Sequence, residues 1–85
     1  MAEIDVHGEG GAAYSVSVSG RHFAVTAAQT LSAELGAPDA AALIRASFGF
    51  LLQREPVGSI LPRFDLSVIE RYFPEWPEVM RQRFR

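Results

Sequence analysis

Two histidines and one carboxylate in the first 22 residues stand at spacings that could bind a metal ion. Asp5 and His7 are two residues apart, so both side chains share one face of a strand, and His22 follows on a later strand. A carboxylate with two imidazoles is a ligand set that zinc accepts. However, an intervening strand would separate the outer two by twice the ~4.8 Å spacing of a sheet. We therefore interpret both histidines as exposed residues on a solvated face and predict no metal site.

Serines at positions 15, 17 and 19 are the next residues that could carry chemistry. No Gly-x-Ser-x-Gly elbow surrounds them, and the nearest base, His22, stands beside Ser19 at a tight turn. The glycine-rich stretch at 8–11 lacks the following helix and the Lys-Ser/Thr pair that a phosphate-binding loop needs. We predict no catalytic residues, no cofactor, no small-molecule substrate and no enzymatic activity.

The segment 71–77, which reads RYFPEWP, is the most distinctive candidate for a contact with another protein. It combines arginine, tyrosine and tryptophan, the residue types that dominate binding hot spots. Two interpretations stay open: Phe73 and Trp76 complete a thin core, or they present an aromatic face to a partner. With one residue from an apolar helix added, the candidate interaction residues are Phe48, Arg71, Tyr72, Phe73 and Trp76.

The amino-terminal third contains the elements expected to form a sheet. Apolar and polar residues alternate through three short segments within residues 2–26, which predicts a three-stranded antiparallel meander with one apolar face. Gly20-Arg21 has glycine at the position that a type II′ turn prefers. That turn would pair Ser19 with His22, Val18 with Phe23, Ser17 with Ala24 and Val16 with Val25.

Helical spacing follows the strands. Thr26-Ala27-Ala28-Gln29 fits a capping box, and Gly36 suits the end of a short first helix. Asp39 is the predicted N-cap of a second helix that begins at Ala40 and ends near Arg54. Apolar residues cover most of this helix, as is typical of a helix buried on several sides. Its interior glycine, Gly49, predicts the close approach of a neighbouring backbone.

The last thirty residues begin irregularly and end in helices. A connector at 57–62 is expected to press Ile60 and Leu61 inward. Asp65 is expected to cap a short helix that ends at Pro74, and a final helix starts near Pro77. The predicted fold class is α+β, an N-terminal three-stranded antiparallel meander followed by three to four α-helices packed on one sheet face. The chain forms one domain, 1–85, made of the meander (2–26), two helices (27–54) and the connector with the C-terminal helices (55–85).

Composition limits the function classes. The 85 residues are 48% hydrophobic and 21% charged, contain no cysteine and carry a net charge of −2. These values predict one folded domain without disulfides or thiolate metal sites. The acidic balance argues against a nucleic-acid partner, because such proteins usually carry a basic stripe. No apolar run approaches the ~20 residues of a membrane span, so we expect a protein of the bacterial cytoplasm that binds no membrane.

Residues 47–74 read SFGFLLQREPVGSILPRFDLSVIERYFP, and they follow a hairpin turn at Val18-Ser19-Gly20-Arg21. This combination resembles short bacterial proteins that have no assigned activity. The resemblance covers most of the chain but implies no function.

Residues 24–52 read AVTAAQTLSAELGAPDAAALIRASFGFLL. This stretch resembles the strand, helix and helix order of ribbon-helix-helix repressors and antitoxins, which implies a dimer whose paired strands enter the major groove of DNA. Here the strand already has a predicted partner in its own chain. Its outward residues His22, Ala24 and Thr26 also include none of the side chains that usually read base edges.

We therefore hypothesise a small, non-catalytic protein-interaction module that contacts an unknown protein partner or a second copy of itself. A homodimer would use the second helix or the aromatic segment 71–77. The alternative is a ribbon-helix-helix-like DNA-binding regulator or antitoxin.

Overall fold

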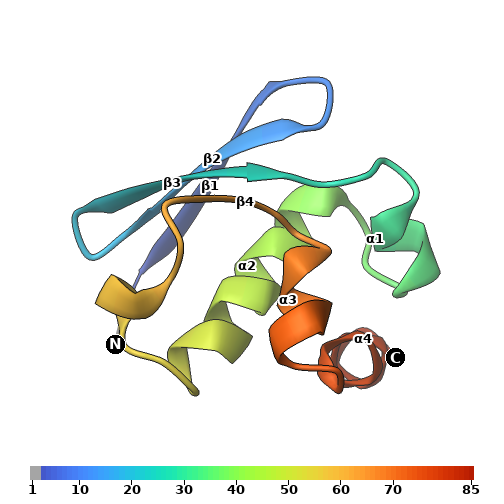
Figure 1. The fold of residues 1–85 in the computed structure, drawn as a ribbon. Helices are drawn as coiled ribbons and strands as arrows, with labels where there is room; N and C mark the ends of the chain where they lie inside the picture. The colour runs from blue at the N-terminus through green and yellow to red at the C-terminus, as the bar shows by residue number, and fades with distance from the viewer. Residues whose placement is uncertain (1–2) are drawn as a thin grey trace.

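A computed structural model describes residues 3–85 and contains a four-stranded sheet with its helices on one side (Figure 1). The strands are β1 (Ile4–Gly10), β2 (Ala13–Val18), β3 (Arg21–Thr26) and β4 (Arg63–Asp65), and they are adjacent in that order. The first three form the predicted antiparallel meander. The fourth strand was not predicted, and it lies parallel to β3.

The turn between β2 and β3 differs from the prediction by one residue. Ser19 and Gly20 form the turn with φ angles of 50° and 80°, so that Val18 pairs with Arg21. Two consecutive positive φ angles are typical of a type I′ turn, whose twist matches that of the strands it joins. Val16 therefore faces Phe23, two residues from its predicted partner. Because side chains alternate with a period of two, this shift leaves the same face of each strand buried.

The first helix begins later than expected. It is α1 (Leu31–Glu34), its N-cap is Thr30, and the predicted capping box at Thr26 is wrong. Thr26 instead ends β3, where its hydroxyl donates a hydrogen bond to Asp65 of β4 at 2.6 Å. Gly36 follows the helix with a φ of 82°, the left-handed conformation that was predicted there.

The second helix, α2 (Ala40–Leu52), packs against the inner face of the sheet (Figure 1). The Asp39 carboxylate accepts a hydrogen bond from the Ala42 N–H at 2.8 Å, which confirms the predicted N-cap. The helix ends two residues before Arg54. Its buried residues lie on several sides, as its apolar circumference predicted: Leu43, Ile44, Ala46, Ser47, Phe48, Phe50 and Leu51.

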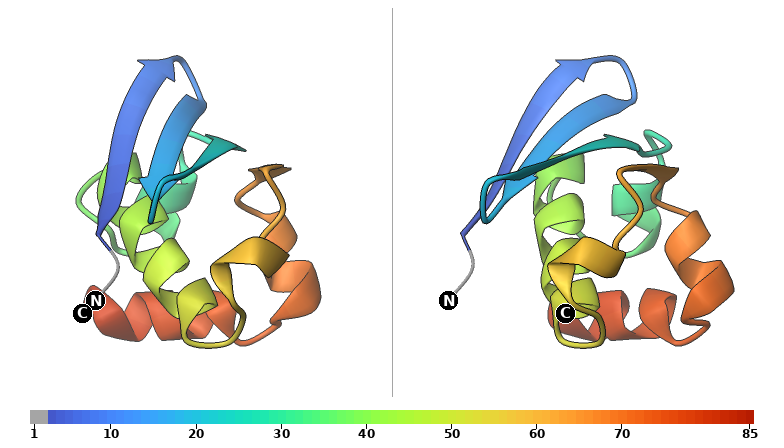
Figure 2. Two further views of the ribbon diagram at one scale, coloured as in Figure 1. Left: turned by 90° about the vertical axis from the view of Figure 1, so that its left-hand side faces the viewer. Right: turned by 60° about the vertical axis from the view of Figure 1, so that its left-hand side comes forward.

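The chain then returns to the sheet and folds back under α2. A 3₁₀ turn, η1 (Val57–Ser59), leads to β4, and α3 (Val68–Tyr72) and α4 (Trp76–Arg83) follow. Helix α4 runs on the side of α2 away from the sheet (Figure 2). The connector was only half predicted: Ile60 is buried as expected, but Leu61 is 49% exposed.

Gly49 lies in the middle of α2, and the predicted close approach of a neighbouring backbone is wrong. A Cβ built on Gly49 has no heavy atom within 4 Å beyond its own helix and chain neighbours. Glycine therefore weakens the helix here without a packing reason.

We predict that Gly49→Ala stabilises the protein by about 0.5–1 kcal/mol, because alanine loses less backbone entropy on folding and fits the open space. The free energy of unfolding in urea measures this change. The matched control is Gly36→Ala, which should destabilise by about 1 kcal/mol because a side chain disfavours a φ of 82°. A destabilised Gly49→Ala variant would contradict the packing described here.

Candidate functional site

Trp76 lies in the core, so its side chain cannot contribute to a contact surface of the folded chain. It is 1% exposed, and its indole N–H donates a hydrogen bond to Ser47 Oγ at 3.1 Å. The Ser47 hydroxyl donates in turn to the Leu43 carbonyl at 2.7 Å. Of the two interpretations of Trp76, the structure selects the core because the indole is enclosed between α4 and α2.

Phe48, the second of the candidate interaction residues, lies in the core as well. It is fully buried between α2 and the sheet, with its ring 5.3 Å from that of Phe23 and 5.9 Å from that of Phe64. Seven residues of α2, Phe48 among them, are buried within this chain.

The remaining candidates lie on and beside α3. Phe73 is half-buried and packs edge-on against Phe50, with ring centres 5.6 Å apart. Arg71 and Tyr72 are exposed, and Tyr72 is 68% accessible to solvent. Only these two of the five predicted residues are therefore exposed.

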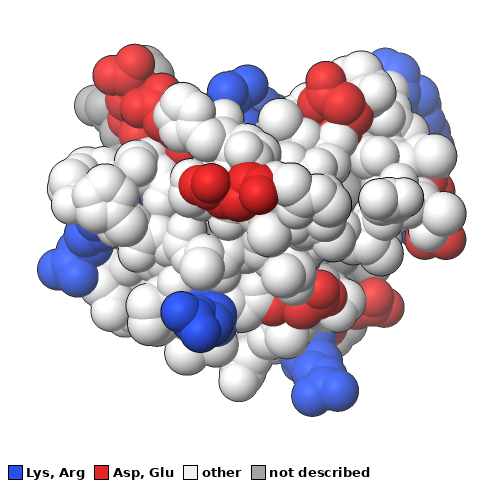
Figure 3. Space-filling model, turned by 90° about the horizontal axis from the view of Figure 1, so that it is seen from above, with Lys and Arg blue, Asp and Glu red and all other residues white. Residues whose placement is uncertain are grey.

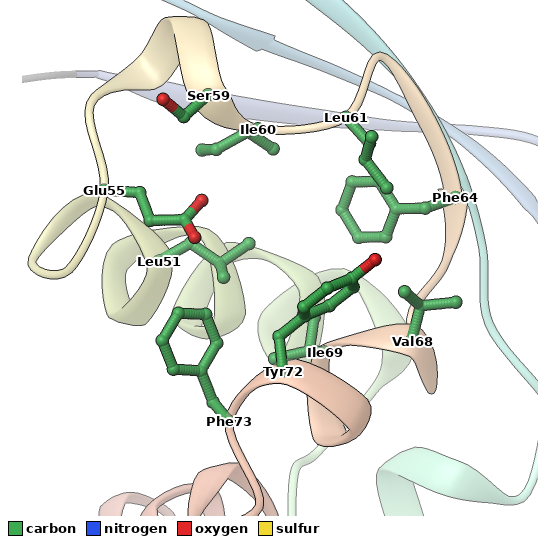
Figure 4. Close-up of a pocket in the computed structure, with 10 residues that line it drawn as sticks. All are labelled: Leu51, Glu55, Ser59, Ile60, Leu61, Phe64, Val68, Ile69, Tyr72 and Phe73. Atoms are coloured by element: carbon green, nitrogen blue, oxygen red, sulfur yellow. The ribbon is translucent and has the colours of Figure 1, made fainter.

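Tyr72 borders an apolar cleft that sequence reasoning missed (Figure 4). The cleft lies between the end of α2, the segment from η1 to β4, and α3, and it has a volume of about 200 Å³. We call it the α2–α3 cleft. Its lining residues are Leu51, Glu55, Ser59, Ile60, Leu61, Phe64, Val68, Ile69, Tyr72 and Phe73.

The α2–α3 cleft has apolar walls and one carboxylate. Figure 4 shows the side chain of Glu55 pointing into the cleft. The neighbouring Arg54 is engaged elsewhere: its guanidinium lies 3.6 Å from the centre of the Phe50 ring and 3.7 Å from the Glu75 carboxylate. Within residues 3–85 no ion pair involves Glu55. The cleft therefore combines a hydrophobic surface with an uncompensated negative charge.

The outer face of the sheet carries the polar residues first considered for chemistry. Asp5 and His22 both lie opposite Ser17, one on each side of β2, so a whole strand separates them. The Ser17 hydroxyl and His22 Nδ1 form an exposed hydrogen bond of 3.0 Å. In the described part of the chain, no three His, Cys, Asp or Glu side chains gather as a metal site would require. Charges are scattered over this face without a basic stripe (Figure 3).

Asp65 joins the end of β4 to the start of α3. Its carboxylate accepts hydrogen bonds from the Ser67 hydroxyl and N–H and from the Thr26 hydroxyl. Partial burial acts to raise the pKa of Asp65, but the three hydrogen bonds outweigh it and hold the pKa below its ordinary value of 3.8. Asp65 thus caps the turn before α3, although that helix begins only at Val68.

Comparison with known proteins gives no assignment: no protein-family model, no curated protein and no solved structure matches this chain. Among residues 3–85, no helix has the length and apolar character needed to cross a membrane.

The hydrogen bond between Trp76 and Ser47 yields a stability prediction. Ser47→Ala leaves the buried indole N–H without an acceptor and should lower the free energy of unfolding by about 1–3 kcal/mol. Chemical denaturation measures the loss. In a Trp76→Phe background, which has no indole donor, Ser47→Ala should lower the free energy of unfolding by a smaller amount. Equal costs in the two backgrounds would refute the energetic coupling.

Asp65 yields a prediction of pH dependence. Because the folded protein holds this pKa below the unfolded value, the ionised carboxylate stabilises the fold above about pH 4, and this contribution disappears as the pH falls through the folded pKa. Asp65→Asn should therefore be less stable than wild type at pH 7, and the difference should shrink towards pH 2.5. Thermal melts across this range measure it. The control Asp5→Asn alters an exposed carboxylate of β1 and should show a small difference throughout.

Proposed function

We propose that this protein is a small, non-catalytic interaction module that takes an apolar side chain of a partner protein into the α2–α3 cleft. The observation that carries the proposal is an apolar hollow bordered by Leu61 and Tyr72, the two large hydrophobic residues that are exposed in the described chain. Exposed apolar surface of this kind often marks a contact with another protein.

The size of the cleft favours a side chain over a metabolite. Sites for small-molecule ligands usually enclose about 300–1,000 Å³. The α2–α3 cleft, at about 200 Å³, is smaller and fits one anchoring side chain. Protein interfaces use such anchors, since a few aromatic or aliphatic groups seated in pockets contribute most of the binding energy.

Residues around the cleft support the same assignment. Tyr72 combines a rigid apolar ring with a hydroxyl, a residue type enriched in hot spots, and Arg71 is exposed next to it. The alternative of DNA binding by a two-chain ribbon has no comparable support. β3 is paired with β2 along one edge, and residues 24–26 on its other edge are paired with β4, so only residues 21–23 of that edge are left for a second copy.

Selection from a peptide display library tests the proposed function. We expect peptides enriched on the wild-type protein to share an apolar anchor and to lose at least tenfold in affinity, about 1.4 kcal/mol, for Tyr72→Ala and for Leu61→Ser. Both residues are exposed, so the variants should keep the wild-type circular dichroism spectrum.

The control variant is Arg81→Ala, which alters an exposed residue of α4 that does not line the cleft. Its affinity for the same peptides should equal that of wild type. Peptides that bind all of these variants equally well would contradict a role for the α2–α3 cleft.

A further inference from the structure

We propose, resting on the function above, that the partner segment carries a lysine or arginine beside its apolar anchor and that Glu55 binds this cation. The occupant of the α2–α3 cleft is therefore a basic, amphipathic protein segment. The negative charge of Glu55 in the cleft is complementary to the positive charge of such a segment.

The backbone fixes the place of Glu55. Its N–H donates a hydrogen bond to the Leu51 carbonyl at 2.8 Å, directly after the end of α2. This bond holds the residue against the cleft wall that Leu51 also forms. The side chain is half-buried and points inward (Figure 4), so its carboxylate faces an incoming ligand.

The basic side chains near this wall of the cleft form no ion pair with Glu55. Arg54 contacts the Phe50 ring, the Phe50 carbonyl and Glu75. Arg21 lies against Gly58 of η1, and no ion pair joins it to Glu55. Among residues 3–85, no basic group pairs with this carboxylate, which can therefore pair with a cation of the partner.

The end of α2 adds to the preference for a cation. A helix carries partial negative charge at its carboxyl terminus, because its last carbonyls lack partners within the helix. Glu55 and Leu51 place this end of the 13-residue α2 at the cleft. The Arg54 guanidinium, which donates to the Phe50 carbonyl, offsets part of this helix-end charge, so Glu55 is the main source of negative potential at the cleft. A neutral anchor would leave the carboxylate partly desolvated without a partner, and an anion would be repelled.

The test compares three probes with the same leucine-sized body and different head groups. Wild-type protein labelled with ¹⁵N is titrated at pH 7 and constant ionic strength with 3-methylbutylammonium, 3-methylbutan-1-ol or 4-methylpentanoate, while amide shifts of the cleft residues are followed. We expect the ammonium to bind about fivefold or more tightly than the alcohol, and the carboxylate to bind most weakly.

Glu55→Gln should bring the affinities for the ammonium and the alcohol within twofold of each other and leave the alcohol unchanged. Glu78→Gln, which removes an exposed carboxylate of α4 outside the cleft, should keep the wild-type order. Equal binding of the ammonium and the alcohol by wild type would overturn the cation preference and leave the proposed function standing. Failure of all three probes to shift the cleft residues would overturn both.

Two further outcomes would assign the cleft to another occupant. Concentration-dependent shifts of the cleft residues in the protein alone would identify a second copy and overturn the proposal. Micromolar affinity for the free ammonium probe would identify a small-molecule amine site and overturn it equally.

Discussion

A hydrogen bond from the Trp76 indole to the Ser47 hydroxyl joins α4 to α2 inside the protein, and the C-terminal half of the fold depends on it. A buried N–H without an acceptor costs free energy, so the indole can be enclosed only where Ser47 meets it. The Met80 sulfur lies 3.8 Å from the same hydroxyl, which puts a second residue of α4 at this contact. Because α4 is anchored under α2, the preceding segment must cross from the sheet to the far side of that helix.

The α2–α3 cleft results from this crossing. The chain leaves α2 at Glu55, returns to the sheet as β4, and descends again as α3. This crossing segment is held at both ends. At one end β4 pairs with β3, and the Ala24 N–H donates a hydrogen bond to the Pro62 carbonyl. At the other end the Trp76 indole is bound to Ser47. Between these points the large apolar side chains Phe64 and Ile69 line the space beside α2 without filling it. A small domain has few residues to close such a gap.

Much of the fold could be predicted from local patterns. Alternation in the first 26 residues indicates the meander, and its even period keeps Val16, Phe23 and Val25 buried although the turn lies one residue away from its expected place. The candidate site was predicted less well. Of the candidate interaction residues, Tyr72 is exposed whereas Phe48 and Trp76 are core residues, and Glu55 and Leu61 of the cleft were not recognised. The type of a residue indicates whether it suits a binding hot spot. Whether its side chain is exposed depends on which distant segments of the chain pack against it.

The sequence by itself determined the elements whose signals are local, such as the apolar face of the meander, the Asp39 cap of α2 and the extensive burial of that helix. Only the tertiary structure decided the pairing of β4, since three residues are too short to show a period and become a strand through the edge that β3 offers. It also decided that Trp76 is enclosed while Tyr72 is exposed. The two aromatic residues stand four apart, and their difference arises because Ser47, 29 residues earlier in the chain, supplies the acceptor for one of them.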